Sequence, residues 1–206
     1  SDLVDIYHQQ REKILMIPVP ASIPMSVVPD SIPEKETSPL KLVLVGRDRY
    51  RKGVDIAIDV VRQLNQSGYE AKLRIVGLNG ENDDAVEYMG LYNKAKPQEL
   101  QDYVANYAWA NVMIHPARFE AAGIVPAEAA AFGVPTITNN VGGLGTTVQD
   151  GVSGIVLPRL SPADAYVKTL TELIENPAQL AQLSRTSRQR YMEELNWANV
   201  SRKIYA

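Results

Sequence analysis

The sequence predicts a doubly wound α/β fold, in which helices cover both faces of a parallel sheet. Three observations lead to this class: strand-like and helix-like segments alternate from Leu40 onward, the strand-like segments are nearly continuous apolar runs, and charged or glycine-rich segments follow several of them. Alternation implies βαβ crossovers, and a strand buried on both faces loses the period-two pattern of a half-exposed sheet. Ligands of such folds bind beyond the carboxyl ends of the strands.

The first βαβ unit has the most distinct pattern. Residues 40–46 and 71–77 each form an apolar run that ends in glycine and is typical of a buried strand. The segment between them carries apolar residues at the spacing of one helix face, namely Val54, Ala57, Ile58, Val61 and Leu64. This spacing predicts a helix, and Gly68 is expected to end it.

The rest of the chain continues the alternation. We expect strands at residues 86–90, 111–115, 135–139 and 154–157. We expect helices at residues 97–107 and 125–132, two more that begin at Pro162 and Pro177, and a final amphipathic stretch that contains Trp197. Proline is well tolerated in the first turn of a helix, which favours these starting points.

Residues 1–39 differ from the α/β pattern. Six of the 13 prolines lie in this stretch, and proline at such density disfavours long helices. We therefore expect two parts: residues 1–39 as a linker or the end of an N-terminal domain, and residues 40–206 as the α/β domain.

Composition excludes several classes of protein. The net charge is −3 with both signs interspersed, which disfavours nucleic-acid and anionic-membrane partners, because these need a basic face. The absence of cysteine excludes a disulfide scaffold, a zinc ribbon and cysteine catalysis, and it fits a reducing compartment, so we expect a cytoplasmic location. No apolar run approaches the roughly 20 residues that span a bilayer.

The first polar segment follows the strand at residues 40–46. Arg47 and Lys52 lie five positions apart on one loop, where a forked guanidinium and a mobile ammonium can converge on a diphosphate. Arg49 and Arg51 lie on the same loop, so a simply solvated basic loop is the alternative. No GxGxxG pattern is present here, which disfavours an ordinary NAD site.

The second polar segment is HPARFEAAGIVPAEAAAFGVP, residues 115–135. Glu120 lies in the loop after a strand, and Glu128 lies in the helix that follows. Between them, Gly123 permits close backbone approach, and the free amides at the helix N-terminus form an anion site. Carboxylates suit sugar hydroxyls, which donate hydrogen bonds to them. The alternative is that Glu120 favours the helix dipole and Glu128 is merely exposed.

The third segment is Asn139-Asn140-Val141-Gly142-Gly143-Leu144, directly after the next strand. Gly142 and Gly143 allow the main chain to approach a ligand, and a plain turn is the alternative interpretation.

Together these intervals resemble the C-terminal, donor-binding domain of GT-B glycosyltransferases of the retaining group 1 family, also called family 4. That family has a Gly-Arg and Lys-Gly pair after the first strand. It then has two glutamates separated by seven residues, the second followed by alanine, and later Asn-x-Gly-Gly. The matching positions here are Arg47, Lys52, Glu120, Glu128 with Ala129, and Asn140 to Gly143. The resemblance extends from about Leu40 to the end of the chain.

The resemblance implies a Rossmann-like fold and transfer of a sugar from a nucleotide diphosphate sugar with retention of configuration. It implies that Arg47 and Lys52 hold the diphosphate and that Glu120 faces the donor sugar, and these three are the expected catalytic residues. Glu128 would accept from the ribose hydroxyls. The remaining donor-binding positions would be Gly123, Ile124, Val125, Gly142 and Gly143. Such enzymes need no metal in the site, and Asp83-Asp84 is not the Asp-x-Asp metal motif of the other major class.

The resemblance also implies an acceptor-binding N-terminal domain that this chain does not contain. Any membrane contact would be made by that domain, and the chain alone is expected to be inactive. The family's Glu-Gly-Phe-Gly is here Glu120-Ala121-Ala122-Gly123, which loses an aromatic ring beside the sugar. Two alternatives stay open: a non-catalytic nucleotide-sugar-binding module, and a sugar-nucleotide epimerase of the same fold.

Overall fold

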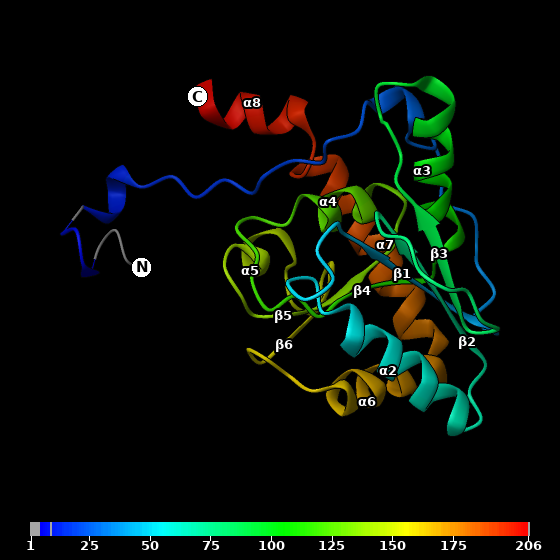
Figure 1. The fold of residues 1–206 in the computed structure, drawn as a ribbon. Coiled ribbons are helices and arrows are strands. Elements are labelled where there is room, and N and C mark those ends of the chain that lie inside the picture. Colours follow the sequence, from blue (N-terminus) through cyan, green and yellow to red (C-terminus); the bar gives the residue numbers. More distant parts are fainter. Residues whose placement is uncertain (1–4, 9, 206) are drawn as a thin grey trace.

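The computed structural model describes residues 5–8 and 10–205 (Figure 1). Its centre is a six-stranded sheet in the order β3-β2-β1-β4-β5-β6, and every neighbouring pair is parallel. This is the strand order of the Rossmann fold, whose order reverses between the first and fourth strands. The predicted fold class is therefore confirmed.

The strands are β1 (Leu40–Val45), β2 (Ala71–Val76), β3 (Val86–Gly90), β4 (Val112–His115), β5 (Thr136–Asn139) and β6 (Gly154–Leu157). The α-helices are α2 (Val54–Gln66), α3 (Pro97–Trp109), α4 (Ile124–Ala131), α5 (Leu144–Thr147), α6 (Ala163–Glu175), α7 (Pro177–Glu193) and α8 (Trp197–Tyr205). Short 3-10 turns η1 (Arg11–Lys13) and η2 (Met25–Val27) precede them. The predicted elements are confirmed to within about two residues at their ends, whereas the single turn α5 was not predicted.

Two apolar layers enclose the sheet. Leu42 and Leu44 of β1 pack toward α2, α6 and the start of α7, which lie below the sheet in Figure 1. Val43 and Val45 of the same strand pack toward α3, α4 and the end of α7 on the other face. Alternate side chains of one strand are thus buried in opposite layers, as the continuous apolar run of the sequence predicts.

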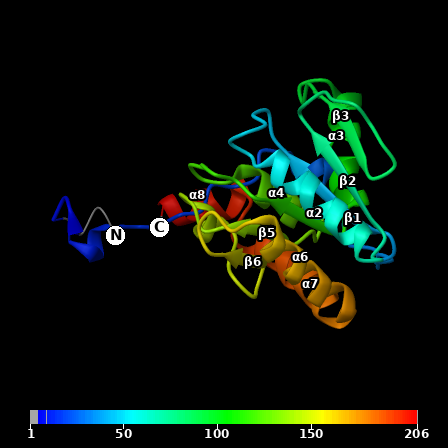
Figure 2. The same ribbon diagram turned by 60° about the horizontal axis from the view of Figure 1, so that its bottom comes forward.

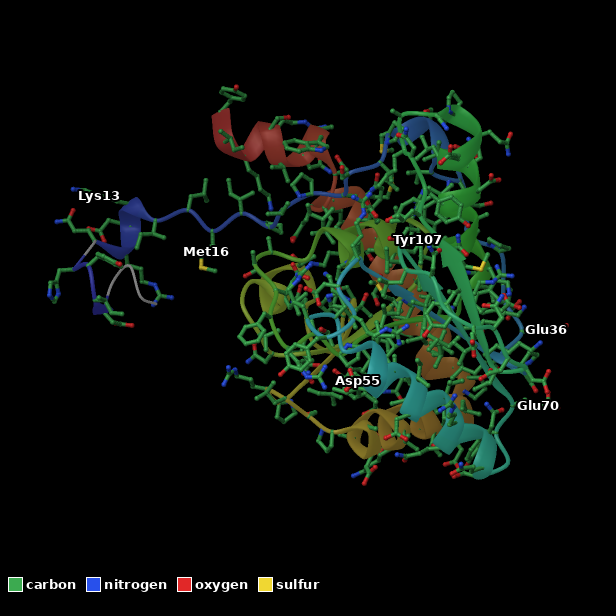
Figure 3. The ribbon with its side chains drawn as sticks, in the orientation of Figure 1. Lys13, Met16, Glu36, Asp55, Glu70 and Tyr107 are labelled. Carbon is green, nitrogen blue, oxygen red and sulfur yellow. The ribbon has the colours of Figure 1, made fainter. Side chains whose placement is uncertain are left out.

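The proline-rich stretch follows an irregular path to β1. The Ala21 amide donates to the Leu195 carbonyl at 2.9 Å, and the Arg188 guanidinium donates to the Pro29 carbonyl at 2.6 Å. Toward the N-terminus the chain extends away from the body on the side of α8, where Lys13 and Met16 lie (Figures 2 and 3). Within the described residues, no helix is both long and apolar enough to cross a bilayer.

The sheet order brings the loop after β1 against the loop after β4, because these strands are neighbours. The Arg118 amide donates to the Arg51 carbonyl at 2.9 Å. Gly53 begins α2 with φ of +67°, and a Cβ there would lie 2.1 Å from the Pro116 carbonyl oxygen. Only glycine lets the two loops approach this closely.

Gly53→Ala is expected to destabilise the fold more than Gly68→Ala. Both glycines have positive φ and lie at opposite ends of α2, but a Cβ at Gly68 would meet nothing within 4 Å. Each alanine substitution lowers the free energy of unfolding by about 1–2 kcal/mol, because alanine disfavours the left-handed backbone conformation. Gly53→Ala should lower the free energy of unfolding by about 1–3 kcal/mol more, because the added Cβ must displace the loop that contains Pro116. Urea unfolding of the two variants measures the difference, and equal losses would show that the loops are not held together.

Candidate functional site

The candidate site lies at the carboxyl ends of the strands, where the loops after β1, β4 and β5 meet. The Gly143 amide donates to the Ala121 carbonyl at 2.9 Å, which joins the second and third of these loops. A Cβ on Gly142, whose φ is +53°, would lie 1.6 Å from the Glu120 carbonyl oxygen. Gly142 and Gly143 therefore let two loops pack against each other. This packing role differs from the approach to a ligand that the sequence suggested.

Glu120 lies at the centre of a cationic cluster. Its Oε2 accepts from the Lys52 ammonium, and it lies 3.4 Å from both Arg51 Nη1 and His115 Nε2. The Lys52 and Glu120 side chains are only 8% and 12% exposed. Lys52 reaches Glu120 across Gly46, where a Cβ would lie 2.5 Å from the Lys52 Cγ. Glycine at this position thus leaves room for the lysine.

Burial and charge act against each other in this cluster. Burial alone would raise the pKa of Glu120, but His115 and Lys52 outweigh it and lower that pKa to about 2. Burial lowers the pKa of His115 and that of Lys52, although Glu120 opposes the change in both. Neither ring nitrogen of His115 makes a hydrogen bond of normal geometry within the described residues. Glu120 is therefore a carboxylate at neutral pH, and His115 is a neutral imidazole.

Glu128 lies in a different environment, fully buried within α4. Its Oε2 accepts from the hydroxyls of Tyr103 at 2.5 Å and Tyr107 at 2.9 Å. Its Oε1 accepts from the Lys94 ammonium at 2.7 Å, and that ammonium also lies 4.6 Å from the centre of the Tyr103 ring. The carboxylate is thus held by two phenols and one cation, and it is not the exposed group of the alternative interpretation.

Arg47 follows β1 on the same loop as Lys52. Burial raises the pKa of the Tyr103 phenol and Glu128 adds to this, whereas the Arg47 guanidinium acts in the opposite direction. Hydrogen bonds pair Lys52 with Glu120 and Lys94 with Glu128.

The N-terminus of α4 lies between the two glutamates. Gly123 precedes the helix with φ of +81° and provides no side-chain cap. The amides of Ile124 and Val125 belong to the first turn, so they have no partner within the helix. A helix start without a capping side chain leaves its amides and its positive dipole end available to an anion.

Several contacts of this site were not predicted from the sequence. Tyr103 and Tyr107 are four residues apart on α3, a spacing that puts both on one helix face and that was the available signal. Lys94 and Arg51 come from loops, where no periodicity indicates the direction of a side chain. His115 was visible at a strand end, but its approach to Glu120 depends on tertiary packing.

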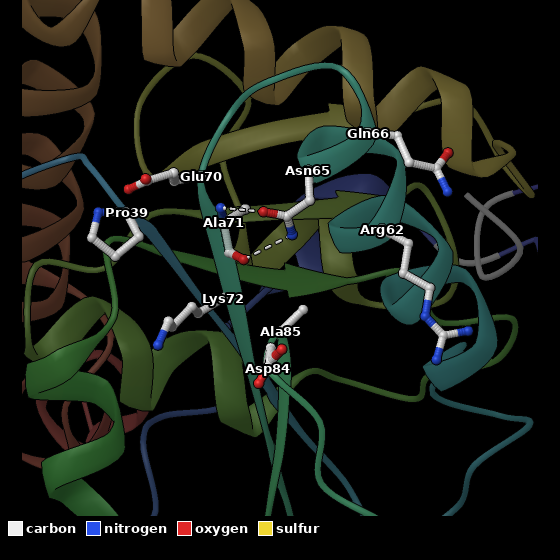
Figure 4. Close-up of a pocket in the computed structure, with 9 residues that line it drawn as sticks. All are labelled: Pro39, Arg62, Asn65, Gln66, Glu70, Ala71, Lys72, Asp84 and Ala85. Atoms are coloured by element: carbon white, nitrogen blue, oxygen red, sulfur yellow. Dashed lines mark hydrogen bonds between the residues drawn. The ribbon is translucent and has the colours of Figure 1, made fainter.

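Two depressions lie at opposite edges of the sheet. One, of about 500 Å³, adjoins Glu120 at the carboxyl edge. The other lies at the amino ends of β1 and β2, beside Pro39 and Ala71 (Figure 4). There the Asn65 side chain pairs with both backbone groups of Ala71, at 3.0 and 3.1 Å, and fastens the end of α2 to the start of β2. Of these two, the first shares Glu120 and Gly142 with the candidate site, and a smaller depression beside Gly143 also adjoins the site.

The strand order defines a Rossmann-like α/β domain, and its polar candidate site lies at the carboxyl edge of the sheet. The family described as Glycosyl transferases group 1 matches residues 30–190. This chain belongs to that family.

The relatives that this chain matches are longer than the chain itself. Glycogen synthase of Mycobacterium tuberculosis strain H37Rv is 28% identical over 173 residues, which cover 80% of this chain and 41% of the relative. D-inositol 3-phosphate glycosyltransferase 1 of Catenulispora acidiphila is 32% identical over 160 residues, which cover 69% and 37%. The chain thus spans less than half the length of these relatives.

Solved structures share the fold. Sucrose-phosphate synthase from Thermosynechococcus elongatus superposes with a TM-score of 0.68 at 25% identity, covering 83% of this chain and 45% of that one. WaaG, a glycosyltransferase involved in lipopolysaccharide biosynthesis, has a TM-score of 0.70 at 23% identity and covers 98% and 58%. Anabaena HepE, solved in complex with UDP-glucose, has a TM-score of 0.65 at 18% identity and covers 81% and 47%.

Acid is expected to destabilise the fold through Glu120. Its pKa is lower in the folded chain, about 2 against 4.5, so its contribution is present above pH 4.5 and is lost as pH falls toward 2. The full loss is about 3 kcal/mol, at about 1.4 kcal/mol per pKa unit. Urea unfolding at a series of pH values measures it.

The variant Glu120→Gln should lack this contribution, so its stability curve should converge with that of the unmodified chain in acid. The control is Glu81→Gln, at an exposed position without an ion pair in the described part of the chain. Parallel curves for the unmodified and Glu120→Gln chains would contradict the role of the cationic cluster.

Proposed function

We propose that this chain is the donor-binding, C-terminal domain of a GT-B glycosyltransferase of family 4. The intact enzyme would transfer a sugar from a nucleotide diphosphate sugar to an acceptor with retention. The observation that carries this proposal is the buried contact between Lys52 and Glu120 beside the uncapped start of α4. It places a cation, a carboxylate and free amides within one edge of the sheet, in a chain of the group 1 family.

The diphosphate would be bound by Arg47, Lys52 and the amides of Ile124 and Val125. Negative charge develops on the leaving nucleotide as the glycosidic bond breaks, and fixed donors aimed at that charge lower the barrier. Loss of one such donor costs on the order of 2.7–4 kcal/mol in other enzymes. No metal ion takes part in this scheme, because two cationic side chains and a helix start supply the positive charge.

Glu120 would face the donor sugar as a carboxylate, which accepts hydrogen bonds from sugar hydroxyls. In the structure the Lys52 ammonium already donates a hydrogen bond to the Glu120 carboxylate. Donor binding would draw the Lys52 ammonium toward the phosphates, and sugar hydroxyls would replace it at Glu120. The flexible four-carbon stem of lysine allows such an exchange without a change in the backbone.

Glu128 would bind the ribose by a similar exchange. Its Oε1 accepts a hydrogen bond from Lys94. The Lys94 side chain is 37% exposed, so it can move outward into solvent. Ribose hydroxyls can reach the carboxylate after Lys94 has moved outward, while Tyr103 and Tyr107 continue to hold Oε2. The two phenols would keep the carboxylate oriented during the exchange.

The remainder of the intact enzyme would bind the acceptor. The chain covers 41% and 37% of the two relatives named above, which leaves room for a second domain in them. In this proposal residues 1–39 are the linker from an acceptor-binding domain, any membrane contact belongs to that domain, and the chain alone does not turn over. A cytoplasmic location stays a prediction from the composition.

Lys52→Met is expected to weaken the binding of a nucleoside diphosphate about ten- to a hundredfold, because a hydrogen bond to a charged group contributes about 1.5–3 kcal/mol. Binding of the parent nucleoside should change little. Calorimetry with UDP, GDP and ADP, and then with the nucleoside of whichever binds, measures both.

Methionine keeps the methylene packing over Gly46, so the variant removes the ammonium without opening a cavity there. Lys72→Met is the matched control, because Lys72 is exposed on β2 near the opposite edge of the sheet. Failure of all three diphosphates to bind would overturn the proposal, and equal losses for nucleoside and diphosphate would exclude a phosphate contact for Lys52.

Glu128→Gln is expected to reduce the preference for a ribonucleotide over its 2′-deoxy form. A carboxylate accepts both ribose hydroxyls, whereas an amide offers one acceptor, and about 1–3 kcal/mol depends on such a contact. The ratio of the two affinities is measured by calorimetry in the unmodified and variant chains. The control is Glu87→Gln, a surface position on β3. An unchanged ratio in Glu128→Gln would refute the ribose contact.

A further inference from the structure

The depression beside Glu120 is lined by three arginines from three different loops. Arg51 follows β1, Arg118 follows β4 and Arg159 follows β6. The depression encloses about 500 Å³, and Asn140 of the loop after β5 also contributes to its wall. Four loops of the carboxyl edge thus converge on a space of the size that a small polar ligand needs.

The three guanidinium groups differ in how far the chain neutralises them. Arg118 donates to both carboxylate oxygens of Asp55, at 2.8 and 2.6 Å. Arg51 lies 3.4 Å from Glu120, but that carboxylate is already bound by Lys52. Arg159 makes no hydrogen bond or ion pair within residues 5–8 and 10–205. The depression therefore holds more positive charge than the surrounding carboxylates balance.

A strained turn positions Arg159. The Ser161 amide donates to the Pro158 carbonyl at 3.3 Å, and the Ser161 hydroxyl donates to the same oxygen at 2.8 Å. Leu160, the third residue of this turn, has φ of +59°, a conformation that type II turns require at this position and that glycine or asparagine usually supplies. Backbone strain of this kind persists where the surroundings enforce it and is concentrated at functional sites.

The chemistry of the wall favours an anion over a neutral sugar. A guanidinium only donates hydrogen bonds, in a planar fork that matches the two oxygens of a carboxylate or phosphate. A neutral sugar ring presents hydroxyls that need acceptors as well as donors, and Glu120 and Asn140 are the acceptors on this wall. Arg159 provides donors that no carboxylate of the described residues engages, and Arg51 shares Glu120 with Lys52.

We propose that this depression binds an anionic group, a carboxylate or a phosphate, carried by one of the two sugars that meet at Glu120. The group belongs either to the transferred sugar, as in a nucleoside diphosphate hexuronate, or to a phosphorylated acceptor. The inference rests on the proposed function, because Glu120 must face the sugar for the depression to lie beside it.

The test starts with the nucleoside diphosphate that binds best among UDP, GDP and ADP. Calorimetry on the unmodified chain then compares the hexose and hexuronate derivatives of that nucleoside diphosphate. A second series compares the binding of hexose 6-phosphate with that of hexose while the nucleoside diphosphate is present. We expect about a tenfold preference for the anionic member of one pair. The preference should shrink as salt is raised, because the site is open to solvent.

Arg159→Gln should reduce this preference about threefold or more while leaving binding of the nucleoside diphosphate unchanged. Arg159 has no partner to lose among the described residues, so the variant is expected to fold normally. Arg185→Gln, an equal change of charge on the exposed surface of α7, is the matched control and should keep the full preference.

Each outcome has a separate meaning. A hexuronate preference that Arg159→Gln reduces supports the transferred sugar as the source of the anion, and a hexose 6-phosphate preference that it reduces supports the acceptor. If the nucleoside diphosphate binds but neither preference appears, or the preference survives Arg159→Gln, this inference is overturned and the proposed function stands. If no nucleoside diphosphate binds, both are overturned.

Discussion

The site depends on one nearly buried ion pair between loops that are 68 residues apart in sequence, Lys52 with Glu120. Neither charge is stable in this position without the other, because an unpaired charge removed from water costs several kcal/mol. The pair is possible only because β1 and β4 are neighbours and because Gly46 and Gly53 let the lysine and its loop come close. The loop after β5 is then attached through Gly142 to the same Glu120 segment.

The two glutamates of the site are each held by a lysine of the chain, but in different surroundings. Glu120 is held at the rim by His115 and Lys52, which lower its pKa to about 2. Glu128 is inside the domain, where Tyr103 and Tyr107 share its charge with Lys94. In the proposed function, both lysines are replaced by hydroxyls of the donor, so binding exchanges one set of polar contacts for another. Such an exchange leaves no carboxylate buried without partners, which is the costly alternative.

The fold was predictable from the sequence because its signals are local. The apolar run of β1, the helical spacing of α2 and the proline at the start of α3 each depend on neighbouring residues, and all three predictions were confirmed. The candidate site was predictable in part, since Arg47, Lys52, Glu120 and Glu128 follow strands that end at one edge. The contacts of Glu128 were not predictable, because its position in a helix does not show which residues of α3 lie against its side chain.

The α/β class, the alternation of strands and helices, and the charged residues that follow the strands are all predictable from the amino-acid order. Which charges are paired and how deeply each is buried depend on the packing of the folded chain, where Arg118 is paired with Asp55 and Arg159 makes no ion pair with any described residue. The physical reason is that periodicity depends on residues one turn or one pleat apart, whereas pairing and burial depend on loops from distant positions. Arg51, Arg118 and Arg159 are ordinary surface residues in the sequence, and only the packing of three loops places them around one depression.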